Sequence, residues 1–315
     1  MRSLADPEVK RREYERVLEQ RDRKQLLPAG ITPKTVRTAV HVLALVGLAT
    51  GLWWLKKVTF STKLQGLLMV GSAVLLGDVG LKLTRRLVPF GMLRRHSAAQ
   101  TAIFAVVGTV YGLIAAFAIV AVWQDYTDAN TVVSQEANAL GALEHMSRGF
   151  DVVTKRQVQE AARTYAYEII HDEWPAMARG KDSERVQGAL TELWQVYTDM
   201  AGKPKQADQS LYERSIYQLT EMDTNRRARL AASQDRIPTI LWLMLYSGAL
   251  STLVLAYLFE SPNDWFQRLV VALLAATTMF AVFLCAALEG PFDGDIAVSS
   301  KPFQYVIDHM QNLER

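Results

Sequence analysis

The chain has 315 residues, of which 50% are hydrophobic and 21% charged, and its formal net charge of +3 is small. We expect no nucleic-acid partner for a chain with so small an excess of positive charge. The single cysteine, Cys285, excludes an intrachain disulfide. The hydrophobic residues are gathered into runs, and the charged residues lie almost entirely between these runs.

Residues 1–37 form a segment that is dense in charge, in which Asp6-Pro7-Glu8 is typical of a helix start. The first apolar run, residues 39–55, would measure about 25 Å as a helix, which is marginal for a hydrocarbon core of about 30 Å. Whether this run spans a membrane therefore stays open at the level of the sequence.

Four more apolar runs follow, each of about the 20 residues that a membrane helix needs: 64–81, 102–123, 237–259 and 265–288. The sequence thus predicts an all-α, polytopic membrane protein with membrane helices within residues 38–123 and 237–288. Residues 124–236 are expected to form a soluble helical-bundle insert between membrane helices three and four, and residues 289–315 a C-terminal tail.

No helix breaker follows Trp123, so the third membrane helix is expected to continue into the insert. Apolar residues at helical spacing predict further insert helices near residues 154–174, 183–200 and 207–235. The last of these is expected to run directly into the fourth apolar run. The tail carries a turn cluster and then a short amphipathic helix near 303–313.

Basic residues suggest how the protein is oriented, because short cytoplasmic loops are rich in Lys and Arg. The 82–100 loop and the N-terminal segment hold most of them. If all five runs cross, the N-terminus and this loop are cytoplasmic, and the insert and the C-terminus lie on the opposite side.

The third run carries a stripe of small side chains that includes a G-x-x-x-G pair, Gly108 and Gly112. Such spacing lets helix backbones approach closely, and a ring of apolar residues can gate a pore by dewetting. Ordinary helix packing is the alternative explanation. The candidate pore-lining residues are Ala105, Thr109, Gly112, Ala116 and Val120.

Charged residues flank this run and are candidates for the two mouths of a pore: Asp125 and Asp128 at one end, Arg85 and Arg86 at the other. The alternatives are a solvated helix face for the acids and a topological role for the arginines. Asp78 is an acid inside a membrane run, which is costly and often functional, although a structural ion pair with nearby Lys82 also explains it.

Glu136, Arg226 and Arg229 lie on insert helices that adjoin the membrane, so we expect a structural ion pair among them. Glu168 and His171 form one E-x-x-H step beside Asp172 and Glu173, but the second copy that a di-metal site needs is absent. We expect a solvated acidic surface there, and no metal.

No phosphate-binding glycine loop, nucleophile elbow or zinc signature occurs. The chain is therefore expected to have no catalytic residues and no cofactor, and not to be an enzyme.

Several short motifs along residues 64–315 resemble the bestrophin-like domain family of bacterial membrane proteins, which have two helices, a helical insert and two more helices. The motifs are Tyr111-Gly112-Leu113, Trp123-Gln124-Asp125-Tyr126, Asp172-Glu173-Trp174-Pro175, Ile237-Pro238 and Pro291-Phe292-Asp293-Gly294-Asp295. The resemblance implies a remote kinship to bestrophins, which are homopentameric chloride channels that keep the region between their second and third helices in the cytosol. That placement is opposite to the one that the basic residues predict here.

The leading hypothesis is a homo-oligomeric ion channel of the bacterial inner membrane, lined mainly by residues 102–123. Its expected partners are the lipid bilayer, inorganic ions and further copies of itself, with a pentamer favoured by the resemblance. The alternative is a non-conducting membrane scaffold or sensor whose helical insert binds a partner.

Overall fold

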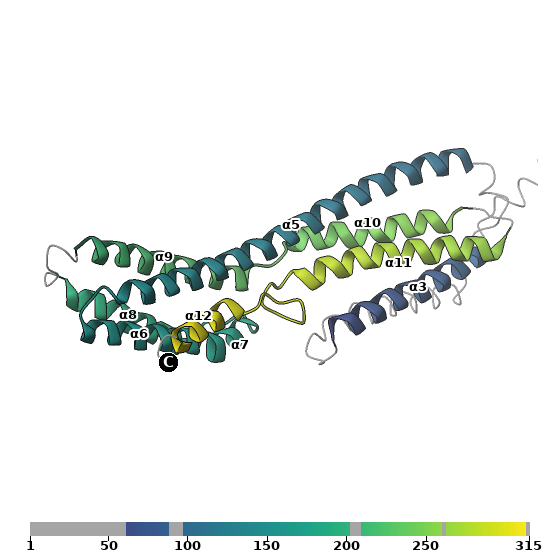
Figure 1. Ribbon diagram of the computed structural model, residues 1–315. Helices are drawn as coiled ribbons and strands as arrows, with labels where there is room; N and C mark the ends of the chain where they lie inside the picture. Colours follow the sequence, from purple (N-terminus) through teal and green to yellow (C-terminus); the bar gives the residue numbers. More distant parts are fainter. Residues whose placement is uncertain (1–60, 88–96, 202–208, 260–262, 313–315) are drawn as a thin grey trace, which may run out of the picture.

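The computed structural model describes residues 61–87, 97–201, 209–259 and 263–312 (Figure 1). These residues form helices joined by short turns, and the described ranges contain no strand. The predicted all-α class is therefore confirmed. The charged segment 1–37 and the first apolar run, 39–55, lie outside the described residues.

Four of the described helices are long and apolar enough to cross a membrane. They are α3 (Thr62–Leu87), α5 (Ser97–Ser147), α10 (Thr239–Tyr257) and α11 (Asp264–Leu288). α11 packs against both α3 and α5, and α10 packs against α5, so the four form one half of the molecule (Figure 1). The polytopic membrane fold expected from the apolar runs is confirmed.

Glycines bring these membrane helices close together. A methyl group added at Gly248 of α10 would lie 2.5 Å from the ring of Tyr111 on α5, and one added at Gly80 of α3 would lie 2.7 Å from the hydroxyl of Tyr257. Larger side chains at these two glycines would push the helices apart. Close packing matters here because lipid tails are as apolar as the side chains, which leaves little hydrophobic drive for association.

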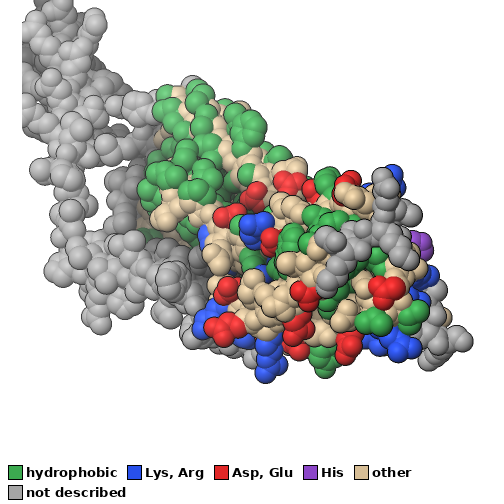
Figure 2. Space-filling view, turned by 90° about the vertical axis from the view of Figure 1, so that its left-hand side faces the viewer, with side chains coloured by type: hydrophobic (Ala, Val, Ile, Leu, Met, Phe, Trp, Pro, Cys, Tyr) green, Lys and Arg blue, Asp and Glu red, His purple; other side chains and the backbone are tan. Residues whose placement is uncertain are grey.

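The polar insert forms the other half of the molecule, a bundle that α5 enters from the membrane half. Its remaining helices are α6 (Val152–Glu168), the π-helix η1 (Ile169–Glu173), α7 (Trp174–Met177), α8 (Glu184–Met200) and α9 (Gln209–Gln234). α9 packs along α5, and α6 packs on α8. Figure 2, a view onto the bundle end, shows charged side chains scattered over the bundle and a hydrophobic region behind it.

α5 belongs to both halves. It has 51 residues, so it is about 76 Å long at 1.5 Å per residue. Neither glycine nor proline occurs between Gly112 and Gly141. The prediction that the third membrane helix continues past Trp123 is confirmed.

The predicted direct passage from α9 into α10 is wrong. Residues 235–238 are not helical, and α10 begins only after Pro238. Proline has no N–H to donate to the preceding turn, and its ring disfavours helical geometry at Ile237. The chain therefore breaks where the bundle meets the membrane half.

The C-terminal tail is part of the bundle. Its helix, α12 (Lys301–Asn312), packs against α5 and α6 and buries Phe303, Ile307 and Met310 in the core. The turn before α12 also reaches the membrane half, because the backbone N–H of Thr62 donates to the Asp295 carboxylate at 2.7 Å. The tail thus connects the start of α3 to the bundle.

Candidate functional site

The membrane portion of α5 has three faces. One is buried against α10 and α11, and one carries large exposed side chains such as Leu113 and Phe117. Between them lies a small-residue face, all of whose members are exposed: Ala105, Thr109, Gly112, Ala116 and Val120. The structure thus places the five candidate pore-lining residues together on one side of the helix, which no other described segment covers.

The G-x-x-x-G pair on this side makes no close helix contact within the described chain. A methyl group added at Gly108 or Gly112 would meet nothing within 4 Å. This contrasts with Gly80 and Gly248, where the neighbouring helix already fills the space. Packing against the described helices of the same subunit therefore does not account for Gly108 and Gly112.

The small-residue face continues beyond the membrane half, where its side chains become polar. Residues at helical spacing from Ala116 and Val120 are Thr127, Asn130, Thr131, Ser134 and Asn138. A cavity of about 290 Å³ lies between this part of α5 and α12, lined among others by Ser134, Asn138, Glu144, Tyr305 and His309. One side of α5 is thus small and apolar in the membrane and polar alongside the bundle.

Asp125 and Asp128 are exposed, and Asp128 accepts a hydrogen bond of 2.8 Å from Gln124. Neither lies on the small-residue face. Asp125 is nine residues beyond Ala116, about two and a half turns, so it projects from the side of α5 opposite to the small-residue face. Asp128 lies about a third of a turn around the helix from the centre of that face. The structure therefore does not bring these acids to the candidate pore lining.

Arg85 and Asp78 are both engaged with α11. Arg85 lies 2.7 Å from the Asp264 carboxylate and donates to Gln267 at 2.5 Å. Asp78 lies 2.5 Å from Lys82 and 3.5 Å from Arg268. The side chain of Arg86 lies outside the described residues.

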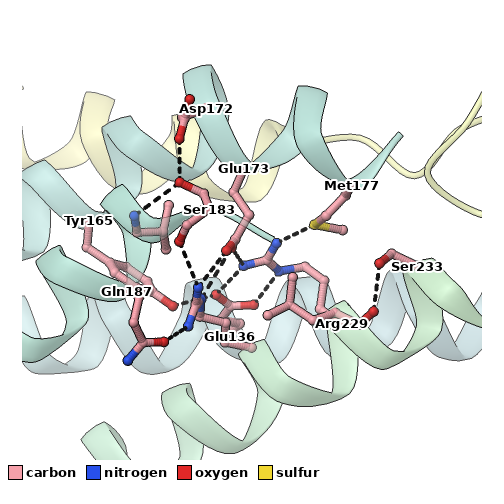
Figure 3. A network of polar contacts seen from close by, with 12 residues as sticks. Glu136, Tyr165, Asp172, Glu173, Met177, Ser183, Gln187, Arg229 and Ser233 are labelled. Atoms are coloured by element: carbon pink, nitrogen blue, oxygen red, sulfur yellow. Dashed lines mark hydrogen bonds and ion pairs between the residues drawn. The ribbon is translucent and has the colours of Figure 1, made fainter. Parts of the chain in front are cut away.

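Charged groups are buried in the bundle, where Glu136 of α5 meets Arg229 of α9 (Figure 3). Nε and Nη2 of Arg229 donate to the two oxygens of Glu136 at 2.7 and 2.9 Å, and the Tyr165 hydroxyl donates to the same carboxylate at 2.8 Å. All three side chains are fully buried. The two helices that adjoin the membrane are thus joined by a two-pronged ion pair.

A second carboxylate completes this network. Glu173 of η1 accepts hydrogen bonds from Arg229 at 2.7 Å and from Arg226 at 2.6 Å, and Arg226 also donates to Gln187 of α8 at 2.6 Å. Arg226 was expected to share Glu136, but it pairs with Glu173 instead. Two acids and two guanidinium groups therefore balance in charge and connect α5, η1, α8 and α9.

Glu173 is the residue that sequence reasoning missed, because it was expected on a solvated acidic surface and is instead fully buried. The π-helix explains the difference. The N–H of Trp174 donates to the carbonyl of Ile169, five residues back, and this wider turn rotates Glu173 inward. Pro175, which has no N–H for the His171 carbonyl, was the available signal.

The electrostatics of the network keep Arg229 charged. Burial opposes the charge on Arg229, but the Glu136 carboxylate and then Glu173 outweigh burial and raise the pKa of Arg229. Burial and then Glu136 raise the pKa of Tyr165 well above its ordinary value, so the hydroxyl stays a donor. Among the described residues no group of three or more His, Cys, Asp or Glu is placed to hold a metal ion. The arrangement is suited to fixing helices in place.

Replacing Arg229 with Gln is expected to destabilise the protein by about 3–5 kcal/mol, because two buried carboxylates lose their shared partner. The control is Arg227→Gln on the same helix, whose side chain is 68% exposed and pairs with Asp223. That change is expected to cost less than about 1 kcal/mol. Thermal unfolding of the full chain in detergent measures both, and similar losses in the two variants would contradict the assignment.

Comparison with known proteins agrees with this architecture. A model of the bestrophin-like domain matches residues 71–303. Two solved structures of a bacterial bestrophin homolog from Klebsiella pneumoniae, each with a single substitution, have the same fold. One gives a TM-score of 0.60 at 12% identity, covering 77% of this chain and 99% of that chain. The other gives a TM-score of 0.59 at 14% identity, covering 78% of this chain and 97% of that chain.

At such low identity these structures demonstrate the fold alone, and no curated protein that was compared matches the sequence. The family model, in contrast, covers well over half of the chain. It spans the membrane helices α5, α10 and α11, most of α3 and the whole insert. This chain belongs to the bestrophin-like domain family.

Proposed function

We propose that this protein is a homo-oligomeric ion channel of the bestrophin type in the bacterial inner membrane. Its pore is lined mainly by residues 102–123 of α5, and a pentamer is the assembly that kinship to bestrophins favours. The channel has no catalytic role. Inorganic ions are its cargo, and further copies of the chain are its partners.

The observation that carries this proposal is the unoccupied small-residue face of α5. Its five members are exposed, and Gly108 and Gly112 have no neighbour within the described chain. In a symmetric assembly the same face from every subunit can converge on one axis, where small side chains leave room for ions. A helix that faced only lipid would gain nothing from glycine at these positions.

The sequence of side chains along the face supports a path for ions. Ala116 and Val120 are uncharged and Val120 is the bulkier, so a ring of Val120 side chains would form an apolar constriction that gates by dewetting. Beyond Trp123 the same face presents Thr127, Asn130 and Ser134, whose polar groups can interact with an ion or its water shell. The pathway would thus pass from a narrow apolar segment to a polar one.

The orientation that we infer follows the basic residues. Lys82 and Arg85 lie at the end of α3 remote from the bundle, and the start of α3 contacts Asp295 near the bundle. The excess of Lys and Arg in the 82–100 loop favours a cytoplasmic position for that end. The bundle and the C-terminus are then on the opposite side.

Charge placed at Val120 is expected to set ion selectivity, because a ring of charged side chains at a constriction repels ions of like charge. In vesicles with a KCl gradient, Val120→Glu should move the reversal potential toward that of potassium, and Val120→Lys toward that of chloride. Val120→Thr, which keeps the shape and adds a hydroxyl, should raise flux several-fold.

The matched control is Val110→Thr, which makes the same change on the large-residue face, where Val110 is 51% exposed. It is expected to leave flux unchanged. Absence of flux in the natural chain and in every Val120 variant, with folded protein in the vesicles, would favour the alternative of a non-conducting scaffold whose bundle binds a partner. A monomer in detergent would also contradict the channel.

Orientation can be measured with a membrane-impermeant maleimide, since Cys285 is the only native thiol and is fully buried. Tyr217→Cys, at an exposed position of α9, is expected to react in intact spheroplasts. Ala99→Cys, at an exposed position near the start of α5, is expected to react only after lysis. The reverse pattern would place the bundle in the cytoplasm and overturn the inferred orientation.

A further inference from the structure

The ends of α3 and α11 that lie away from the bundle carry a cluster of charged side chains. Lys82 and Arg268 flank Asp78 at 2.5 and 3.5 Å, and Arg85 lies 2.7 Å from Asp264. Among the described residues, three cations therefore face two carboxylates. The cluster keeps a net positive charge after its internal ion pairs are formed.

Arg85 is held rigidly in this cluster. It donates to Gln267, whose own amide donates to the carbonyl of Phe259 at 2.6 Å. The Nε atom of Arg85 is buried and has no hydrogen-bond acceptor among the residues that the structure describes. The two acids of the cluster thus leave one positive charge unbalanced and the Nε donor of Arg85 without an acceptor among the described residues. Lys82 and Arg268 remain about half exposed.

The surroundings are those of a membrane interface. Trp265 and Phe266, in the first turn of α11, are 68% and 54% exposed, and aromatic side chains of this kind concentrate at headgroup depth. Leu75, near the middle of α3, and Leu269, next to Arg268 on α11, are exposed and offer an apolar surface. Residues 82–95 contain five Lys or Arg and no Asp or Glu.

We propose that Lys82, Arg85 and Arg268 bind the phosphate of an anionic phospholipid headgroup between the ends of α3 and α11. Basic pockets between membrane helices recognise lipid phosphates by direct charge pairing. The nearby apolar surface assigns the ligand to lipid rather than to free phosphate, because acyl chains can lie along Leu75 and Leu269. The site is independent of the proposed pore, since it lies on α3 and α11.

Lipid binding can be measured on the full chain in detergent by native mass spectrometry with phosphatidylglycerol or phosphatidylcholine as the probe. The natural chain is expected to retain phosphatidylglycerol preferentially. Lys82→Gln and Arg268→Gln should each weaken that retention about five-fold, the effect of one Lys or Arg at an anionic membrane surface. Arg268→Lys keeps the charge and should restore most of the binding.

The matched control is Lys63→Gln, which removes an exposed positive charge from the opposite end of α3. It is expected to leave retention unchanged. Equal retention of the two lipids, or an equal loss in Lys63→Gln, would overturn the proposal. Displacement of phosphatidylglycerol by millimolar inorganic phosphate would also overturn it, because the site would then take a soluble anion.

Discussion

The unbroken course of α5 is the constraint on which the rest of the structure depends. Within a bilayer every backbone N–H and C=O must be bonded inside the chain, so the membrane segment can only be helical. Because no glycine or proline intervenes between Gly112 and Gly141, the same hydrogen-bond ladder continues into water. One rigid rod therefore fixes how the membrane helices and the bundle lie relative to each other, whereas the return path through α9 and α10 is broken at Pro238.

The buried ion network holds this rod against the bundle. A buried ion pair adds little net stability compared with apolar packing, but the loss of one partner leaves an uncompensated buried charge, which is costly. Such a pair therefore favours the one arrangement of helices in which both partners meet. Here Glu136 of α5 and Glu173 of η1 share Arg229, and Trp174 and Phe303 lie against the guanidinium at 5.4 and 5.8 Å. The tail helix α12 supplies Phe303, which explains why the C-terminal segment packs into the bundle.

Much of this fold could be predicted because physical lengths and periods constrain it. Bilayer thickness sets the lengths of the apolar runs that form α3, α10, α11 and the membrane part of α5. Apolar residues that recur about every 3.6 residues indicated the insert helices. Regular helical spacing missed the inward turn of Glu173, because one extra residue in a turn changes the side on which every later side chain lies; Pro175 alone signalled a disturbed turn. The positions of Asp125 and Asp128 away from the small-residue face could have been predicted, because the sequence already indicated a continuous helix and its spacing fixes their direction. The packing of α12 depends on tertiary contacts that no local pattern contains.

The network and the small-residue face lie on opposite sides of α5, and this relation links the two halves of the molecule. Glu136 is 20 residues beyond Ala116, about five and a half turns, so it projects from the side opposite to the face. A rotation of α5 about its axis would break the hydrogen bonds of Glu136 to Arg229 and Tyr165. In the membrane, α5 packs through small side chains such as Ala115 and Ala118, and the ring of Tyr111 fits closely against Gly248 of α10. The direction of the small-residue face is therefore held both by buried charges outside the membrane and by close packing within it.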